Sequence, residues 1–190
     1  KDEQDSLLAL DVIAGRYARA VRRGLADARP LKADRLEWTW REMAFRRRDG
    51  GIEKLRQRLA DQEKITLAPG ASDADGTVRM ATVCATALRR MIEMQGKGQS
   101  LTPVSEIQGL RLGPVLLLGE PFETFQAIKN DVRAKAGQSP VLVMGLTNDY
   151  LGYAPDRTAA ARGGYATDTG PLMIGALPFA GIHDELVEAL

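Results

Sequence analysis

The sequence predicts a mixed α/β fold built on a parallel strand–helix–strand unit, with flanking helices and a loop rich in tyrosine and glycine. Residues 115–118 and 141–144 are short, continuously apolar runs, which is typical of strands that are covered on both faces. Between them, apolar residues recur at helical spacing over 122–132, and Gly137 ends this pattern. A strand–helix–strand connection within one sheet makes the two strands parallel.

Composition restricts the classes of protein to which the chain can belong. Its 190 residues are 44% hydrophobic and 27% charged, so the chain can bury a core. The net charge of +1 argues against a dedicated binder of nucleic acid or anionic membranes. One cysteine and one histidine exclude an internal disulfide and a Cys/His zinc site built by this chain alone. No transmembrane segment is expected, because no apolar run approaches about 18 residues.

The first half of the chain is expected to contribute helices and one strand. Apolar residues spaced four apart predict a helix over 6–28. Apolar and polar residues alternate over 36–40, which predicts a strand with one buried face and, at Glu42-Met43, a bulge. The charged run 46–51 is expected to be a solvated turn.

Further periodic segments complete the expected order of elements. Helices are predicted over 52–62 and 77–95, and a strand over 106–112. Residues 147–182 are rich in Gly, Pro, Tyr, Thr and Asp, and we expect them to be mostly loop. A last helix is predicted over 184–190. The sequence begins at Lys1 without a signal peptide, so we expect that the chain was processed or that its start lies outside this sequence.

Two segments follow the buried strands at the edge of the sheet where ligands bind in parallel folds. They are residues 119–123 and the tyrosine-rich segment 147–153, so an acid and a phenol can converge there. The same residues also have purely structural interpretations. Glu120 is suited to a helix N-terminus. Tyr150, Tyr153 and Tyr165 are suited to packing on the core, and His183 is suited to a capping or surface position.

Read together, segments 112–122, 143–153 and 164–165 resemble the neutral/alkaline non-lysosomal ceramidase family, in particular its short bacterial members. In that family a Gly-Glu pair follows a strand, and a helix and a strand lead to an Asn-x-Tyr-x-x-Tyr segment. A further tyrosine comes twelve residues later, as Tyr165 does after Tyr153 here. The resemblance implies that residues 1–190 are the C-terminal part of one hydrolase domain, about half of a larger catalytic domain. Residues 1–100 would be a packing layer and 101–190 the part that bears the site.

The resemblance also implies a chemistry, because the family's enzymes are zinc-dependent hydrolases of an N-acyl amide bond. Their zinc is held by two His, one Glu and one Tyr. Glu120 and Tyr153 match the Glu and Tyr ligands, and Tyr165 matches a tyrosine that stabilises charge on the attacked carbonyl. A shifted alignment selects Glu123 in place of Glu120. Bound zinc lowers the pKa of its water towards about 7.

The two family histidines come from the N-terminal half, whereas this chain has only His183. We therefore expect an N-terminal half or a second polypeptide, made separately or released by cleavage, to supply them. The implied substrate is a small-molecule or lipid amide. Two further functions are compatible with the residues: a non-catalytic ceramidase-like binding module, or an ester or other amide hydrolase on the same metal site. Because family members are often exported, the resemblance favours a periplasmic or secreted protein.

Overall fold

The chain divides into two compact units, Lys1–Ala33 and Asp34–Leu190. The first unit contains α1 (Glu3–Ala26), in agreement with the periodicity of this segment, and its apolar side chains are exposed. None of the helices that the structure describes is both long and apolar enough to cross a membrane. The computed structural model describes residues 3–48, 50–137 and 140–190.

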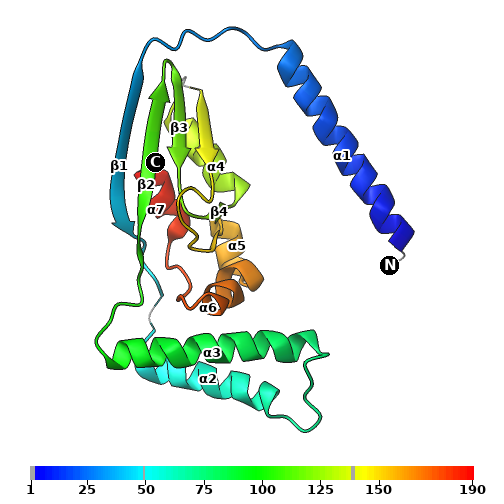
Figure 1. The fold of residues 1–190 in the computed structure, drawn as a ribbon, viewed down its shortest axis with the longest axis vertical. Helices are drawn as coiled ribbons and strands as arrows, with labels where there is room; N and C mark the ends of the chain where they lie inside the picture. Colours follow the sequence, from blue (N-terminus) through cyan, green and yellow to red (C-terminus); the bar gives the residue numbers. More distant parts are fainter. Residues whose placement is uncertain (1–2, 49, 138–139) are drawn as a thin grey trace. The chain divides into compact units, whose positions relative to one another are not determined.

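The second unit is organised around a four-stranded sheet (Figure 1), and the mixed α/β fold class is confirmed. Its strand order is β1-β2-β3-β5, with antiparallel pairs from β1 to β3. The strands β3 and β5 are parallel, as the apolar runs predicted, and α4 (Gln126–Lys135) connects them. The strands are β1 (Leu36–Ala44), β2 (Val104–Leu112), β3 (Val115–Gly119) and β5 (Val141–Met144).

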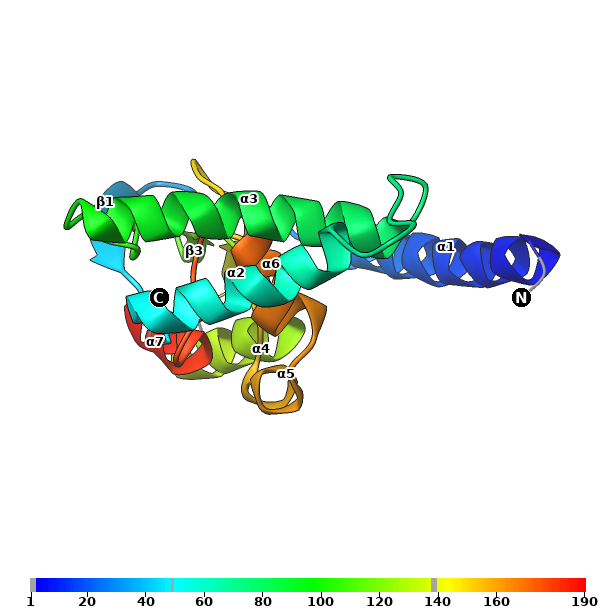
Figure 2. The ribbon, with the colours of Figure 1, turned by 90° about the horizontal axis from the view of Figure 1, so that it is seen from below.

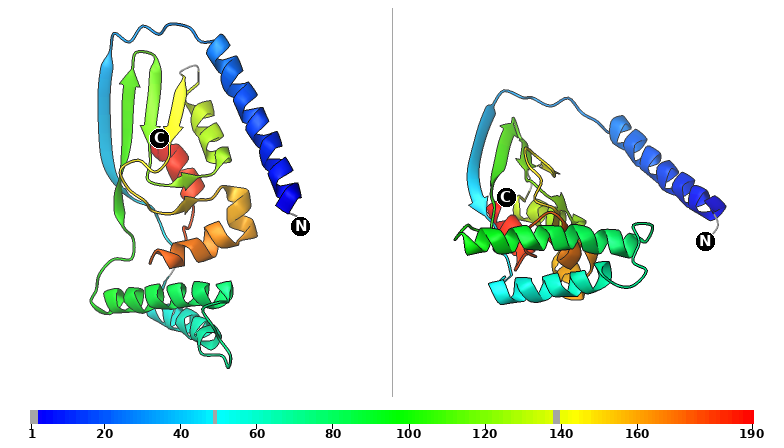
Figure 3. Two further views of the ribbon diagram at one scale, coloured as in Figure 1. Left: turned by 45° about the vertical axis from the view of Figure 1, so that its right-hand side comes forward. Right: turned by 60° about the horizontal axis from the view of Figure 1, so that its bottom comes forward.

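One face of this sheet carries the main core. The helices α4 and α7 (Ile182–Ala189) cover it, and they lie behind the sheet in the left view of Figure 3. Phe122 is fully buried at the centre of this core. Its ring lies 5.1 Å from that of Phe45 and 5.4 Å from that of Phe179, both in edge-to-face geometry. This arrangement suits the aromatic quadrupoles and anchors the chain just after β3.

The opposite face of the sheet differs from the expectation. Trp38 is 71% exposed and Trp40 is 50% exposed, so the predicted buried face of this strand is wrong for the unit. Leu142 is 53% exposed as well, so the covering of both faces expected for the apolar strands is also wrong. The physical reason is that α4 and α7 both pack on the same side. The predicted bulge is wrong, because β1 pairs with β2 in unbroken register.

A pair of helices forms a second, smaller core. The helices α2 (Ile52–Thr66) and α3 (Gly76–Gly96) run side by side (Figure 2) and bury Leu55, Leu88 and Met91. Asp75 begins α3, since its carboxylate accepts a hydrogen bond from the amide of Thr77 at 2.7 Å. The first of these helices extends beyond the predicted end at residue 62, and the second agrees with the prediction within one residue.

The segment 147–182 is more structured than its composition indicated. It contains short elements, none longer than six residues, which the prediction of a mostly loop segment did not include. Elements this short contain too few residues to display a hydrophobic period. They are β6 (Tyr153–Ala154), which pairs with β4 (Glu123–Thr124), then α5 (Arg157–Arg162), the π-helical turn η1 (Tyr165–Thr169) and α6 (Gly170–Met173).

In the charged run after β1, the prediction of a solvated turn is wrong for Arg47 and Arg48, which pack against the rest of the unit. Arg46 is exposed, and residue 49 lies outside the described residues. The Arg47 guanidinium lies 3.5 Å from the centre of the Phe179 ring and donates to the carbonyl of Leu177 at 2.8 Å. Desolvation lowers the pKa of Arg47 to about 10, so it remains charged at neutral pH. Arg48 donates to Asp168 at 2.8 Å. These contacts fasten the chain before α7 to the end of β1.

Candidate functional site

The candidate site lies where β3 and β5 end side by side. Gly119 pairs with Met144 at the ends of the two parallel strands, so the segments that follow leave from the same edge, as predicted. The segment after β5 folds back onto the one after β3. The amide of Thr147 donates to the carbonyl of Glu120 at 2.9 Å, and the amide of Leu151 donates to that of Pro121 at 2.8 Å. These bonds hold the two site-bearing segments together.

The short parallel pair β4–β6 then sets which side chains meet. Glu123 pairs directly with Tyr153 in this register. The hydroxyl of Tyr150 donates to Oε1 of Glu123 at 3.3 Å. A side-chain hydrogen bond with Glu123 and the charge of its carboxylate raise the pKa of Tyr153. Burial and then the charge of Glu123 raise the pKa of Tyr150. One carboxylate therefore lies between two phenols.

The third tyrosine of the predicted site joins this cluster. Tyr165 opens η1, and its ring lies 5.9 Å from that of Tyr153, edge to face at 68°. It is 52% exposed, so about half of this residue is open to solvent although its ring contacts Tyr153. The structure thus brings together the two tyrosines that the family resemblance singled out, and it places Glu123 beside them.

Glu120, the acid that the resemblance favoured, has a different environment. Its side chain is fully buried. One carboxylate oxygen accepts from the amide of Phe122 at 2.8 Å, and the other accepts from the hydroxyl of Thr124. Burial raises the pKa of this carboxyl, and the hydrogen bonds from Thr124 and Phe122 act in the opposite direction. The carboxylate therefore stabilises the turn, and Glu123, the residue of the shifted alignment, is the acid that lies beside the tyrosines.

An open depression of about 450 Å³ lies over this edge. Glu123 and Tyr153 supply its acidic and phenolic groups, and Lys129 supplies a cation. Within the described residues, no three His, Cys, Asp or Glu side chains gather to hold a metal. A carboxylate and a phenol are suitable oxygen ligands for half of a four-coordinate zinc site, so the residues present fit such a site in part. The lining residues are Phe122, Glu123, Thr124, Phe125, Lys129, Gly145, Leu146 and Tyr153.

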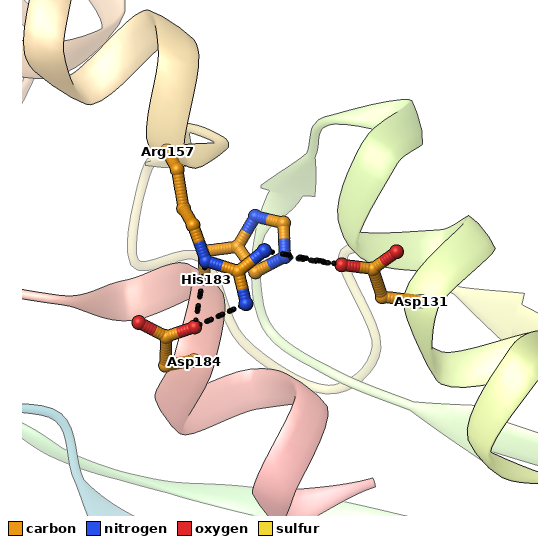
Figure 4. Close-up of polar contacts among 4 residues, drawn as sticks. All are labelled: Asp131, Arg157, His183 and Asp184. Atoms are coloured by element: carbon orange, nitrogen blue, oxygen red, sulfur yellow. Dashed lines mark hydrogen bonds and ion pairs between the residues drawn. The ribbon is translucent and has the colours of Figure 1, made fainter.

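His183 contributes to a separate polar cluster (Figure 4), and the surface position considered for it is wrong, because it is buried. Its Nε2 lies 2.9 Å from Oδ2 of Asp131, and its Nδ1 has no hydrogen-bond partner among the described residues. Arg157 donates to the same Asp131 oxygen at 3.3 Å and to Asp184. The cluster ties α4, α5 and α7 together. His183 does not line the depression, so its role here is structural.

Acid should weaken this cluster. The hydrogen bond from His183, followed by that from Arg157, holds the pKa of Asp131 below its usual 3.8. A carboxyl with a lowered pKa in the folded state stabilises the fold above 3.8, and this contribution is lost as the pH falls through the folded-state value. We expect Asp131→Asn to reduce the acid dependence of the unfolding free energy, measured by urea titration between about pH 2 and 6. Asp73→Asn, in the loop before α3, is the matched control.

The close approach of the two site segments depends on Gly145. A Cβ atom at this position would lie 2.6 Å from the Phe122 carbonyl oxygen and 3.2 Å from Oε1 of Glu120. We expect Gly145→Ala to lower the unfolding free energy by about 1–3 kcal/mol, because the backbone must move. Gly96→Ala is the control, since its Cβ would meet open space at the end of α3. Equal urea midpoints for the two variants would contradict this role.

Comparison with known proteins finds limited likeness. No family model matches the chain, and no curated protein matches it. A neutral ceramidase from Pseudomonas aeruginosa is similar in structure, with a TM-score of 0.42 and 17% sequence identity. The alignment covers 82% of this chain and 27% of the ceramidase chain. A ceramidase complexed with C2 is also similar in structure, with a TM-score of 0.36 and 27% sequence identity. That alignment covers 45% of this chain and 13% of the ceramidase chain. The chain therefore spans only 27% and 13% of these two proteins.

Proposed function

We propose that this chain is the C-terminal part of a zinc-dependent hydrolase that cleaves an N-acyl amide bond, in the manner of neutral ceramidases. The observation that carries the proposal is the pairing of β4 with β6, which puts a carboxylate beside a phenol. The pair lies at the carboxyl edge of two parallel strands, where catalytic groups collect in such sheets. The sequence motifs that resemble the ceramidase family occupy these same segments.

Glu123 and Tyr153 would hold the zinc ion from this chain, and two histidines from an N-terminal half or a second polypeptide would complete the set. When bound, zinc supplies a Lewis acid and a water of lowered pKa. Glu123 provides the negative charge, and the Tyr150 hydroxyl orients it by donating to Oε1. Glu120 fixes the turn on which Glu123 stands through its bonds to Phe122 and Thr124. In this way Glu123 would bind the metal, and Glu120 would hold the turn that positions Glu123.

Tyr165 is suited to the substrate side of the site. Its exposed phenol, in ring contact with Tyr153, can donate a hydrogen bond to the oxygen of an attacked acyl carbonyl. An amide or an ester carbonyl would be bound in the same way, so the acyl group and the leaving group define the substrate. A small-molecule or lipid amide is the substrate class that we propose.

A second candidate function is a non-catalytic binding module with the same scaffold. It is favoured by one observation: the chain's single histidine is buried against Asp131 and does not reach the depression. The two functions differ in metal content. A well-folded intact assembly without metal supports the binding module, and about one zinc per unit supports the enzyme.

The test uses the intact assembly, with zinc measured by plasma mass spectrometry and hydrolysis of N-acyl amide and ester substrates measured in parallel. We expect Tyr165→Phe to keep zinc but to lower kcat for the amide by about a hundredfold, the usual effect of losing one oxyanion donor. Tyr153→Phe should lower both zinc content and activity. Tyr17→Phe, on the exposed surface of α1, should change neither. Unchanged kcat in Tyr165→Phe would remove this tyrosine from the mechanism.

A further inference from the structure

The start of α7 borders a small cavity that is separate from the candidate site. The cavity has a volume of about 140 Å³. Pro155 and residues of α5 and η1 form part of its wall, and the segment 179–184, which leads into α7, forms the rest. Among the described residues, none that lines this cavity also lines the depression beside Glu123 and Tyr153. A ligand bound here would therefore occupy a second site.

One buried polar atom in the wall of this cavity has no partner. The side chain of His183 is only 5% exposed, and its Nε2 lies 2.9 Å from Oδ2 of Asp131. Nδ1 is buried and has no hydrogen-bond partner among the described residues. Figure 4 shows Nε2 turned towards Asp131 and Nδ1 at another edge of the ring. The carboxylate can only accept, so Nε2 carries a proton, and Nδ1 of the neutral ring is an unused acceptor.

The first turn of α7 adds hydrogen-bond donors to the same wall. The first amides of an α-helix have no partner within the helix. Gly181, which precedes α7, has no side chain to cap them. Residues 181–184 all line the cavity, and Ile182 and His183 are buried. A ligand in the cavity can therefore meet donors from the helix start and an acceptor from the imidazole.

The charges around the cavity argue against an anionic ligand. Two carboxylates, those of Asp131 and Asp184, accompany one guanidinium, that of Arg157, which donates to both. A ligand anion would add a third negative charge to this group. An ammonium ligand could donate to Nδ1 but could not accept from the helix amides. A hydroxyl group both donates and accepts, so it suits both sides of the cavity.

The rest of the wall limits the size of the ligand. Ala160, Phe179 and Ile182 contribute apolar surface to it. A water molecule occupies about 30 Å³, so the volume corresponds to roughly four or five groups of that size. The side chains of Arg157 and Asp184, which also line the cavity, are 60% and 66% exposed, so the cavity reaches the surface. A hydroxyl on a short apolar group fits this space.

We propose that this cavity binds a small alcohol, or the hydroxyl-bearing end of a longer one. The ligand hydroxyl donates to Nδ1 of His183 and accepts from an amide at the start of α7. Asp131 positions the imidazole, because it keeps the proton on Nε2 and leaves Nδ1 free to accept. The inference does not depend on the proposed zinc site, and it adds a second binding site to the chain.

The first experiment observes the ring of His183 directly, because it is the chain's single histidine. In the full chain labelled with nitrogen-15 histidine, long-range proton–nitrogen spectra report Nδ1 and Nε2 separately. We expect propan-1-ol to shift the Nδ1 signal in the direction of an accepted hydrogen bond. Its dissociation constant should be on the order of millimolar, since so few atoms contact the protein.

Two probes of nearly the same size, propionate and propylamine, test the choice of a hydroxyl. Each should bind at least tenfold more weakly than propan-1-ol in the same titration. A response to either ion that equals the response to propan-1-ol would overturn the proposal. An Nδ1 signal that propan-1-ol leaves unchanged would overturn it as well.

Ala160→Leu tests the location, because the larger side chain fills the cavity from α5 without replacing His183 or Asp131. We expect at least tenfold weaker binding of propan-1-ol, with unchanged circular dichroism and an unchanged Nε2 signal. Ala161→Leu is the matched control, since Ala161 is exposed on the same helix and should keep wild-type affinity. Wild-type affinity in Ala160→Leu would place the alcohol elsewhere and overturn the proposal.

A second variant removes the acceptor and keeps a ring of similar size. His183→Phe should weaken binding of propan-1-ol at least tenfold, measured by saturation-transfer spectra of the ligand, and unchanged binding would contradict the role of Nδ1. Hexan-1-ol then distinguishes the two sources of the hydroxyl. Binding as tight as that of propan-1-ol shows that the cavity takes the end of a longer molecule, and loss of binding shows that it takes a free small alcohol. Both results support the site.

Discussion

Replacing Glu123 by glutamine is expected to remove zinc from the intact assembly and to lower amide hydrolysis by more than about a hundredfold. Even changes to residues that only support a metal ligand typically cost about 10–100-fold, and this change removes a charged ligand itself. Glutamine has the same shape, and the side chain is only partly buried at the rim, so the fold should persist. Zinc content, kcat and circular dichroism of the same preparation give the measurement.

The comparison with Glu120→Gln makes this prediction decisive. The buried Glu120 carboxylate only accepts hydrogen bonds, and the Thr124 hydroxyl can turn to accept one from the new amide. We therefore expect Glu120→Gln to fold and to retain zinc. The alignment that places Glu120 on the metal predicts the reverse pattern. Loss of zinc in Glu120→Gln, with normal zinc in Glu123→Gln, would show that Glu120 is the metal ligand.

The sequence was sufficient to place the site-bearing segments, because apolar runs at 115–118 and 141–144 indicate buried strands directly. It was not sufficient to predict which acid lies beside the tyrosines. The position of Glu123 there depends on β4 and β6, which are two residues each and show no period of their own. Their register is set by backbone bonds such as the one from the Glu123 amide to the Gly152 carbonyl at 2.9 Å, which sequence alone does not reveal.

Two further differences have the same origin in long-range contacts. Alternation over 36–40 correctly predicted a strand, but alternation cannot say whether a face is covered by the chain itself or by something else. The arginines at 46–48 look like a solvated turn locally, yet Arg47 packs on Phe179 from the far end of the chain. The histidine at 183 is buried for a similar reason, since its partner Asp131 belongs to another helix.

The largest effect on stability should come from Phe122→Ala, which we expect to lower the unfolding free energy by about 3–5 kcal/mol. Phe122 is fully buried, and its loss opens a cavity between the rings of Phe45 and Phe179. Urea unfolding of the second unit gives the measurement. Phe125→Ala is the control, because Phe125 is only partly buried and its loss leaves a smaller void.

The same variant should also disturb the site, since the Phe122 backbone connects the two segments that carry it. Its amide donates to Glu120 at 2.8 Å, and its carbonyl accepts from the amide of Leu146 at 3.2 Å. A conservative change to leucine should recover part of the stability, because most of the volume returns. A result in which Phe122→Leu regains stability while its zinc binding stays impaired would show that the aromatic contacts of Phe122 position the zinc-binding residues as well as fill the core. If Phe122→Ala costs no more than Phe125→Ala, the proposed centre of the core is wrong.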